Sequence, residues 1–191
     1  MRKILLVAML AALVGCVPPP ARVVTPHTEA LDHSASVDLP VGWVRQYVQN
    51  GPMLASRDGF SLQTISLTHR PLDKAFPKTK KTAAEGMLPS ELAELRIAEL
   101  KAQTPHTAAL IVIDNVPAML DGRDGFRVQT SYRTGRGLEI GHVTYAVADR
   151  SGYYQMDYVA PKLHYFDQTA GDFEKVVASF RIAGKEKTAP K

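Results

Sequence analysis

The distribution of apolar positions predicts a domain rich in β-strands. Residues 125–133 alternate between a side with Phe126, Val128 and Tyr132 and a polar side, as in a strand with two different faces. Residues 138–148 are apolar on both sides, which indicates a central strand covered on both faces. Further strands are expected at residues 37–39, 43–48, 53–57, 60–69, 108–113, 118–120, 153–159 and 180–182.

Two segments have the spacing of amphipathic helices. Pro89 suits a first helical turn, and a wide apolar face runs from there to about Gln103. Arg96 and Glu99 interrupt this face, and their i, i+3 spacing predicts an ion pair between them. A second helix is expected over residues 162–178.

Consecutive strands with two inserted helices predict an α+β fold, in which helices pack on an antiparallel sheet. The apolar alternation slips within residues 60–69, which indicates a bulge. Residues 114–117 are expected to interrupt a strand. Residues 35–183 are long enough for one sizeable core and contain no internal repeat, so we expect a single α+β domain there.

The start of the chain has the organisation of a signal peptide. Met1-Arg2-Lys3 is basic, and residues 4–14 are apolar and uncharged. This run is shorter than the roughly 20 residues of a transmembrane helix and has the length of a signal-peptide h-region. It ends in Leu13-Val14-Gly15-Cys16, which resembles the lipobox of bacterial lipoprotein precursors.

In lipoprotein precursors, the cysteine sulfur receives a diacylglyceryl group, the chain is cut just before it, and the freed amine is acylated, for example with palmitate. The resemblance implies that residues 1–15 are removed and that Cys16 attaches the protein to a membrane, since two or more acyl chains hold stably. The alternative is a secretory signal with an incidental cysteine, for which residues 16–20 offer a poor cleavage site. Val17 replaces the Asp that holds enteric lipoproteins at the inner membrane, which favours the outer membrane, facing the periplasm.

Polar segments flank the predicted domain. Residues 16–34 are expected to be the lipidated cysteine and a flexible, proline-rich tether, because they lack apolar periodicity. Pro18-Pro19-Pro20 favours polyproline II within it. Residues 184–191 form a polar tail. The formal net charge of +4 falls to +2 once Arg2 and Lys3 are lost, so the domain itself is close to neutral.

Composition excludes several classes of protein. Hydrophobic residues make up 45% and charged residues 22%, which argues against a wholly disordered chain. A single cysteine forms neither an intramolecular disulfide nor a multi-cysteine zinc site. The six histidines lack zinc-motif spacing, and His142 is expected to be a hydrogen-bonded core residue. The mild basic charge gives no case for nucleic acid, and we expect neither a metal nor a cofactor.

We recognise no catalytic motif. A Gly-x-Ser-x-Gly elbow is absent from the sequence, and Cys16 is used by the expected anchor. Asp121 and Asp124 flank glycines in a turn, where turn chemistry explains them. Residues 134–137 join two strands, so they do not form a phosphate loop. A non-enzymatic role is favoured, and the alternatives are an envelope hydrolase with an unrecognised site or a small-ligand carrier.

Two basic clusters are candidates for contact with an anionic surface, such as lipid head groups or lipopolysaccharide phosphates. The alternative for both is an ordinary solvated face. Tyr153, with Gln155 and Asp157 on its face, would suit a partner surface if exposed, and packing is the alternative. The clusters are Lys74, Lys78, Lys80 and Lys81 in one loop, and Arg123, Arg127, Arg133 and Arg136 around a hairpin.

The order of these segments resembles the PsbP-type domain, which also occurs in Ran-release factors of the Mog type and in many small bacterial lipoproteins. Residues 39–43 (Leu-Pro-Val-Gly-Trp), the strand at 60–69, the middle helix and residues 172–181 carry the resemblance. It implies an α/β/α sandwich and transfers no site residue. The expected function is a lipid-anchored envelope lipoprotein, acting as a non-enzymatic binding or assembly module with an unknown envelope partner.

Overall fold

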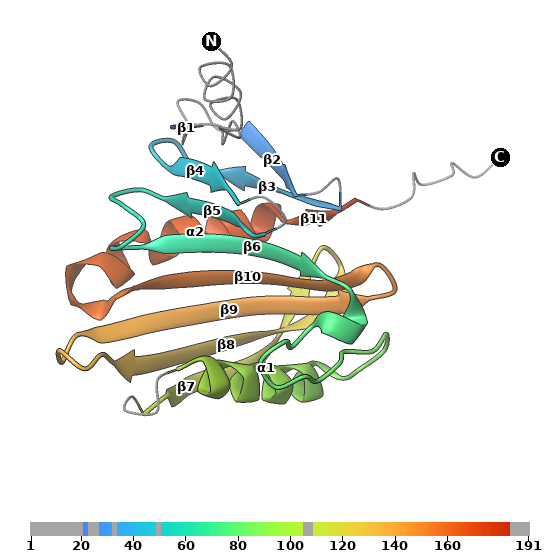
Figure 1. The fold of residues 1–191 in the computed structure, drawn as a ribbon. Coiled ribbons are helices and arrows are strands. Elements are labelled where there is room, and N and C mark those ends of the chain that lie inside the picture. The colour runs from blue at the N-terminus through green and yellow to red at the C-terminus, as the bar shows by residue number, and fades with distance from the viewer. Residues whose placement is uncertain (1–20, 23–26, 32–33, 49–50, 105–108, 184–191) are drawn as a thin grey trace, which may run out of the picture.

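The computed structural model describes residues 21–22, 27–31, 34–48, 51–104 and 109–183, whose strands form two antiparallel sheets (Figure 1). The large sheet has the strand order β1-β4-β5-β6-β10-β9-β8-β7, and the small sheet has the order β11-β3-β2. The strands are β1 (Ala21–Arg22), β2 (His27–Leu31), β3 (Ala35–Leu39), β4 (Val44–Tyr47), β5 (Met53–Ser56), β6 (Thr64–Arg70), β7 (Ile111–Leu120), β8 (Arg123–Arg133), β9 (Glu139–Asp149), β10 (Gly152–Pro161) and β11 (Arg181–Ile182).

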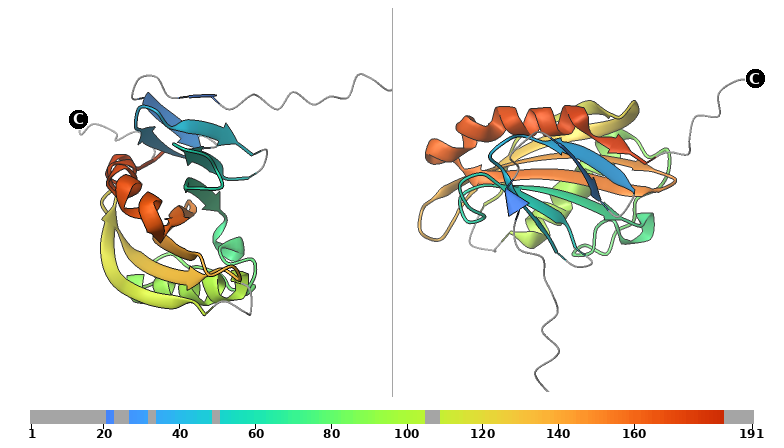
Figure 2. Two further views of the ribbon diagram at one scale, coloured as in Figure 1. Left: turned by 90° about the vertical axis from the view of Figure 1, so that its left-hand side faces the viewer. Right: turned by 90° about the horizontal axis from the view of Figure 1, so that it is seen from above.

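Two helices cover opposite faces of the large sheet. Helix α1 (Pro89–Gln103) packs over β7 and β8, and its bounds match the sequence prediction. Helix α2 (Asp167–Ser179) lies against the other face and contacts β3 of the small sheet, as the two views of Figure 2 make visible. The protein therefore has the predicted α+β class, with helices on both sides of an antiparallel sheet.

Alternation along the central strands divides the core in two. On β10, Tyr154, Met156 and Tyr158 face α2 and the small sheet in the larger cluster of buried apolar residues. Tyr153 on the same strand faces the opposite way and packs with Phe76 in a smaller cluster between α1 and the sheet. Strand β9 is covered on both faces, as its two-sided apolar pattern predicted.

The two sequence segments at the ends of the predicted domain meet in space. The indole Nε1 of Trp43 donates a hydrogen bond to Asp172 Oδ2 at 3.1 Å, and Trp43 is fully buried. Asp38 N donates to Ser179 Oγ at 2.8 Å, which joins β3 to the end of α2. The small sheet is thus fixed to the C-terminal helix.

Local details differ from the prediction at the ends of elements. Strand β6 starts at Thr64 and pairs with β10 without a bulge, because residues 60–63 form a turn instead of strand. Strand β7 continues through residues 114–117, with a register shift between Val112 and Asp114; Pro117 is tolerated because β7 is an edge strand. The last helix begins after an irregular turn, η2 (Lys162–Phe166), in which Leu163 and His164 have non-helical backbone angles.

Part of the expected tether is structured, and that expectation is wrong for residues 27–31. They form β2, which pairs antiparallel with β3, and Glu29 within it is buried. A short strand of this kind gains its apolar contacts only when β3 is in place, so sequence periodicity does not reveal it. The expected signal peptide (1–15), Cys16 and the polar tail (184–191) lie outside the described residues.

Candidate functional site

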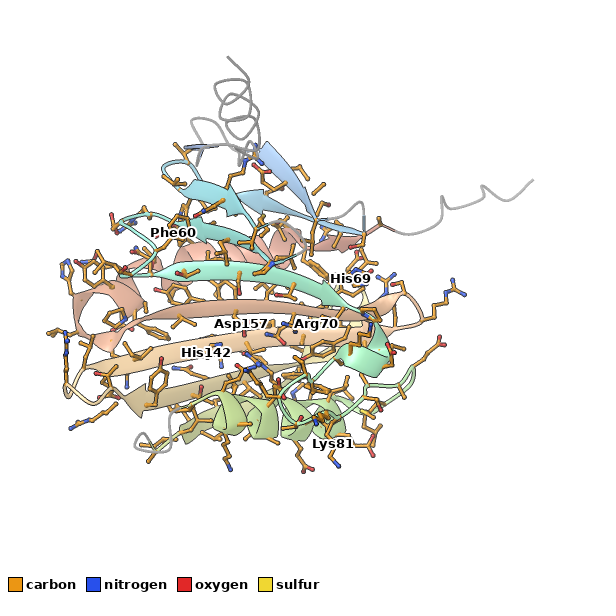
Figure 3. The ribbon with its side chains drawn as sticks, in the orientation of Figure 1. Phe60, His69, Arg70, Lys81, His142 and Asp157 are labelled. Carbon is orange, nitrogen blue, oxygen red and sulfur yellow. The ribbon has the colours of Figure 1, made fainter. Side chains whose placement is uncertain are left out.

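A charged cluster is buried between α1 and the central strands, centred on Asp157 of β10. Asp157 Oδ1 accepts hydrogen bonds from Arg96 Nη2 at 2.9 Å and from Thr144 Oγ1 at 2.6 Å. His142 Nε2 lies 2.9 Å from the same oxygen, and Gln155 Nε2 donates to Oδ2. Figure 3 shows His142 and Asp157 close together on the sheet above α1.

Strand register brings these side chains to one face. Asp157 pairs with Thr144 across β9, and alternation sends both toward the α1 side while Tyr158 points the other way. From the facing helix, Arg96 enters the cluster with only 3% of its surface exposed. A buried carboxylate and a buried guanidinium therefore satisfy each other where neither could remain alone.

The predicted ion pair between Arg96 and Glu99 is wrong, because the two residues turn to different partners. Arg96 binds Asp157, whereas the Glu99 carboxylate accepts hydrogen bonds from Lys78 N and Thr79 N, both at 2.8 Å, and from Thr79 Oγ1 at 2.9 Å. Both residues are buried. A buried charge needs several hydrogen bonds, and a pair between neighbours on one helix would not provide them.

Both buried carboxylates are held in the charged form. Burial would raise the pKa of Asp157, but the charge of Arg96 and the bonds from His142 and Thr144 outweigh it, so its pKa lies well below the usual range. Burial would likewise raise the pKa of Glu99, and the hydrogen bonds from Lys78 and Thr79 lower it below the ordinary value. Both groups are ionised at neutral pH.

The composition of this cluster resembles that of a catalytic triad, but its geometry does not. In a triad, the histidine uses one ring nitrogen for the carboxylate and the other for the nucleophile. Here His142 Nε2 contacts both Asp157 Oδ1 at 2.9 Å and Thr144 Oγ1 at 3.3 Å, and Thr144 donates its own proton to Asp157. All three side chains are buried, so the cluster has the properties of a structural network.

The four candidate lysines lie together on an ordered loop. Glu99 fixes this loop by accepting hydrogen bonds from the amides of Lys78 and Thr79. Phe76 of the same loop packs in the smaller apolar cluster between α1 and the sheet. Within the described part of the chain, none of the lysines takes part in an ion pair, so their charges face solvent. The exposed lysines are Lys74, Lys78, Lys80 and Lys81.

The four candidate arginines do not form one surface. Arg123 pairs with Asp121 at 2.7 Å and Asp149 at 2.9 Å, at one end of β8. Arg127 pairs with Asp114 at 2.8 Å. Arg133 and Arg136 lie at the other end of this strand, about 30 Å from Arg123 at about 3.3 Å per residue. Of the two predicted clusters, only the lysines lie on one loop and form no ion pair with the described residues.

Strand β7 presents an apolar edge. It is the last strand of the large sheet, and Met119 and Ile111 are exposed by 63% and 59%. Single exposed apolar residues are ordinary, but several of them along an edge that pairs with no described strand favour pairing with another chain. The exposed apolar residues of the strand are Ile111, Val112, Ile113, Val116 and Met119.

Three of the hollows on the described surface differ in size, and none of these three combines a histidine with a carboxylate. The largest, about 750 Å³, is lined by residues around Arg57, Asp58 and Phe60. The other two, about 270 and 190 Å³, are both lined in part by Tyr132. Among the residues that the structure describes, no group of three or more His, Cys, Asp or Glu side chains is placed to hold a metal ion.

The sequence indicated parts of this site but not its assembly. His142 is a hydrogen-bonded core residue, as predicted, and Tyr153, Gln155 and Asp157 are buried, which favours the packing alternative over a partner surface. The sequence did not indicate that Asp157 is the centre of a buried charged cluster. The signal that pointed to it was a charged residue, Arg96, on the apolar face of a predicted helix.

Comparison with known proteins identifies the fold. No family model matches the sequence, and no curated protein matches it either. Among solved structures, cyanobacterial PsbP (CyanoP) from Synechocystis matches with a TM-score of 0.61 and 12% identity, over 89% of this chain and 98% of that one. The Ran-binding protein Mog1p of Saccharomyces cerevisiae gives 0.53 and 8%, over 83% and 97%.

A third structure, LpqN, is described as involved in cell envelope biogenesis of Mycobacterium tuberculosis. It matches with a TM-score of 0.50 and 14% identity, over 87% of this chain and 90% of that one. The described domain therefore has the PsbP/Mog-type fold that the order of segments indicated. At these identities the likeness concerns the fold, and it carries no residue roles across.

Proposed function

We propose that this chain is a lipid-anchored cell-envelope lipoprotein whose PsbP/Mog-type domain acts as a non-enzymatic binding or assembly module. The sequence Leu13-Val14-Gly15-Cys16, placed directly after a basic and apolar leader, supports the anchor. Among the described residues, no helix is long and apolar enough to cross a membrane. An attachment through lipids on Cys16 would hold the domain at a bilayer without such a helix.

The observation that carries the non-enzymatic role is the geometry around His142. Asp157 and Thr144 both lie against the same ring nitrogen, and the carboxylate is engaged by Arg96 and Gln155 as well. A general base must reach a substrate proton, and these groups are occupied and buried. The arrangement stabilises the sheet–helix interface and occupies the Asp157 carboxylate and the Nε2 nitrogen of His142.

The edge of β7 supports a binding role. Its side away from β8, which pairs with no strand among the described residues, offers backbone groups to an extended strand of a partner. Its exposed apolar side chains offer burial. We propose that the module recognises an envelope protein that adds such a strand. By its similar fold, LpqN supports the view that this architecture serves at a cell envelope. Val17 favours the outer membrane, with the domain facing the periplasm.

Membrane fractionation tests the anchor. The wild-type chain should sediment with membranes, and Cys16→Ser should move to the soluble fraction because it has no sulfur for lipid attachment. Gly15→Ala is the matched control, because it keeps a small residue before the cysteine and should stay with membranes. Equal membrane retention of wild type and Cys16→Ser would refute the anchor.

Cross-linked pulldown from membranes tests the module. Ile113→Lys, near the start of β7, should abolish partner retention, since it places a charge on the apolar edge. Leu138→Lys is the control, because Leu138 is also exposed but lies outside β7. A wild-type chain that retains no partner and hydrolyses a compound in a broad substrate screen would overturn the non-enzymatic role.

A further inference from the structure

Arg70, the last residue of β6, is a half-buried cation without an ionic partner. No carboxylate within the described residues pairs with it and no acceptor binds its guanidinium, in contrast to Arg96, Arg123 and Arg127. Burial lowers the pKa of Arg70, and the like charge of Arg96 lowers it further. An arginine in such surroundings is stabilised by any anion that approaches it.

Two fully buried donors beside Arg70 also lack partners. Tyr153 pairs with Arg70 across the β6–β10 register, so both side chains lie on the α1 face. The Tyr153 hydroxyl has no hydrogen-bond partner and its side chain is 0% exposed. Arg96 Nε is likewise unpartnered, although Arg96 Nη2 binds Asp157. Leaving such groups unpaired is costly, so their convergence calls for an acceptor.

The acceptors nearby are already in use. Asp157 Oδ1 binds Arg96 and Thr144, and Oδ2 binds Gln155. The two oxygens of Glu99 bind loop amides and the Gln103 side chain. Arg70, Arg96 Nε and the Tyr153 hydroxyl therefore lack an acceptor. Because arginine side chains only donate hydrogen bonds, the group that would satisfy them carries a negative charge and several acceptor oxygens.

We propose that Arg70, Arg96 and Tyr153 form a binding site for an oxyanion group, a phosphate or a carboxylate. The anion enters from the side of Arg70, which is partly exposed, and the buried hydroxyl of Tyr153 lies behind it. Figure 3 shows Arg70 beside Asp157 on the sheet, whereas Lys81 lies at the lower edge of α1. The site uses none of the four candidate lysines and no residue of β7.

Titration of the full-length chain in non-ionic detergent with inorganic phosphate, against chloride at equal ionic strength, tests this site. Phosphate should bind saturably and raise the unfolding midpoint of the wild type. Arg70→Gln should weaken phosphate binding by about 10- to 100-fold, the value of one charge-assisted hydrogen bond. Arg181→Gln, which removes an exposed charge on β11, is the matched control and should bind as the wild type does.

Tyr153→Phe provides a second variant. It removes only an unpartnered hydroxyl, so its midpoint in chloride should equal or exceed that of the wild type, while its phosphate affinity falls. Vesicles containing phosphatidylglycerol, compared with phosphatidylcholine vesicles, distinguish a lipid head group from free phosphate as the source. Arg70-dependent binding of either probe supports the site. Equal phosphate effects on wild type and Arg70→Gln, or no effect on either with no Arg70-dependent vesicle binding, overturn it.

Discussion

The two faces of the large sheet are stabilised by different interactions, although the same strands build both. On the α2 face, Tyr158 stacks on Phe173 at 5.5 Å, within a cluster that is almost entirely apolar. On the α1 face, Asp157 is surrounded by hydrogen bonds and by the charge of Arg96. Side-chain alternation along β10 alone separates the two environments. We infer that apolar burial holds α2, whereas α1 combines a smaller apolar cluster with a charged network.

The largest expected effect is on the apolar face. Phe173→Ala removes a ring that is 1% exposed, and it should lower the free energy of unfolding by about 3–5 kcal/mol through lost burial and a residual cavity. Leu163→Ala, at a side chain that is 80% exposed, should change it by less than about 0.5 kcal/mol. Urea unfolding measures both, and similar losses for the two variants would contradict the assigned core.

The charged face should respond differently to single and double changes. Arg96→Met leaves Asp157 buried without its cation and should cost about 3 kcal/mol or more. The double variant Arg96→Met with Asp157→Leu should recover most of that loss, because an apolar pair often replaces a buried ion pair without penalty. A double-mutant cycle by urea unfolding decides this; additive losses would contradict direct coupling between the two residues.

Acid should weaken the charged face selectively. The pKa values of Asp157 and Glu99 are lower in the folded protein than in the unfolded chain, so unfolding takes up protons at low pH. Their contribution is complete above the unfolded-state values of about 4 and is lost as pH falls through the folded-state values. Urea midpoints between pH 7 and 3 should therefore fall less steeply in Asp157→Asn than in the wild type. Parallel curves would contradict the depressed pKa of Asp157.

The smallest effect concerns the lysine loop. Glu99→Gln weakens the hydrogen bonds to Lys78 N and Thr79 N and should cost about 1–2 kcal/mol. Its clearer consequence is local: trypsin should cut faster after Lys78 and Lys81 because the loop opens more often. Glu94→Gln, at an exposed position of the same helix, is the control. Unchanged cleavage in Glu99→Gln would show that other contacts fix the loop.

The sequence specifies the elements more completely than the contacts between them. Helix α1 and the two-sided strand β9 follow from periodicity, because their burial is repeated along the element itself. The partner of Arg96 is 61 positions away, so spacing within the helix suggested Glu99 instead. Likewise, the lysines were visible as a cluster, but the carboxylate that orders their loop comes from 20 or 21 residues further along the chain.

The unpartnered donors around Arg70 illustrate the same limit. Tyr153 and Arg70 become neighbours only through the register of β6 with β10, which joins the middle and last thirds of the chain. A sequence pattern records that each residue exists but not which acceptors its neighbours have already used. The network on the α1 face was therefore accessible only once the strands were placed.

The central claim is that the domain is a binding module held to the envelope by lipids on Cys16. Mass spectrometry of the N-terminal peptide of the membrane-derived protein tests it most directly. The account predicts a peptide that begins at Cys16, carries a diacylglyceryl group on sulfur and is acylated on the amine. A peptide that begins elsewhere, or an unmodified cysteine, would contradict it.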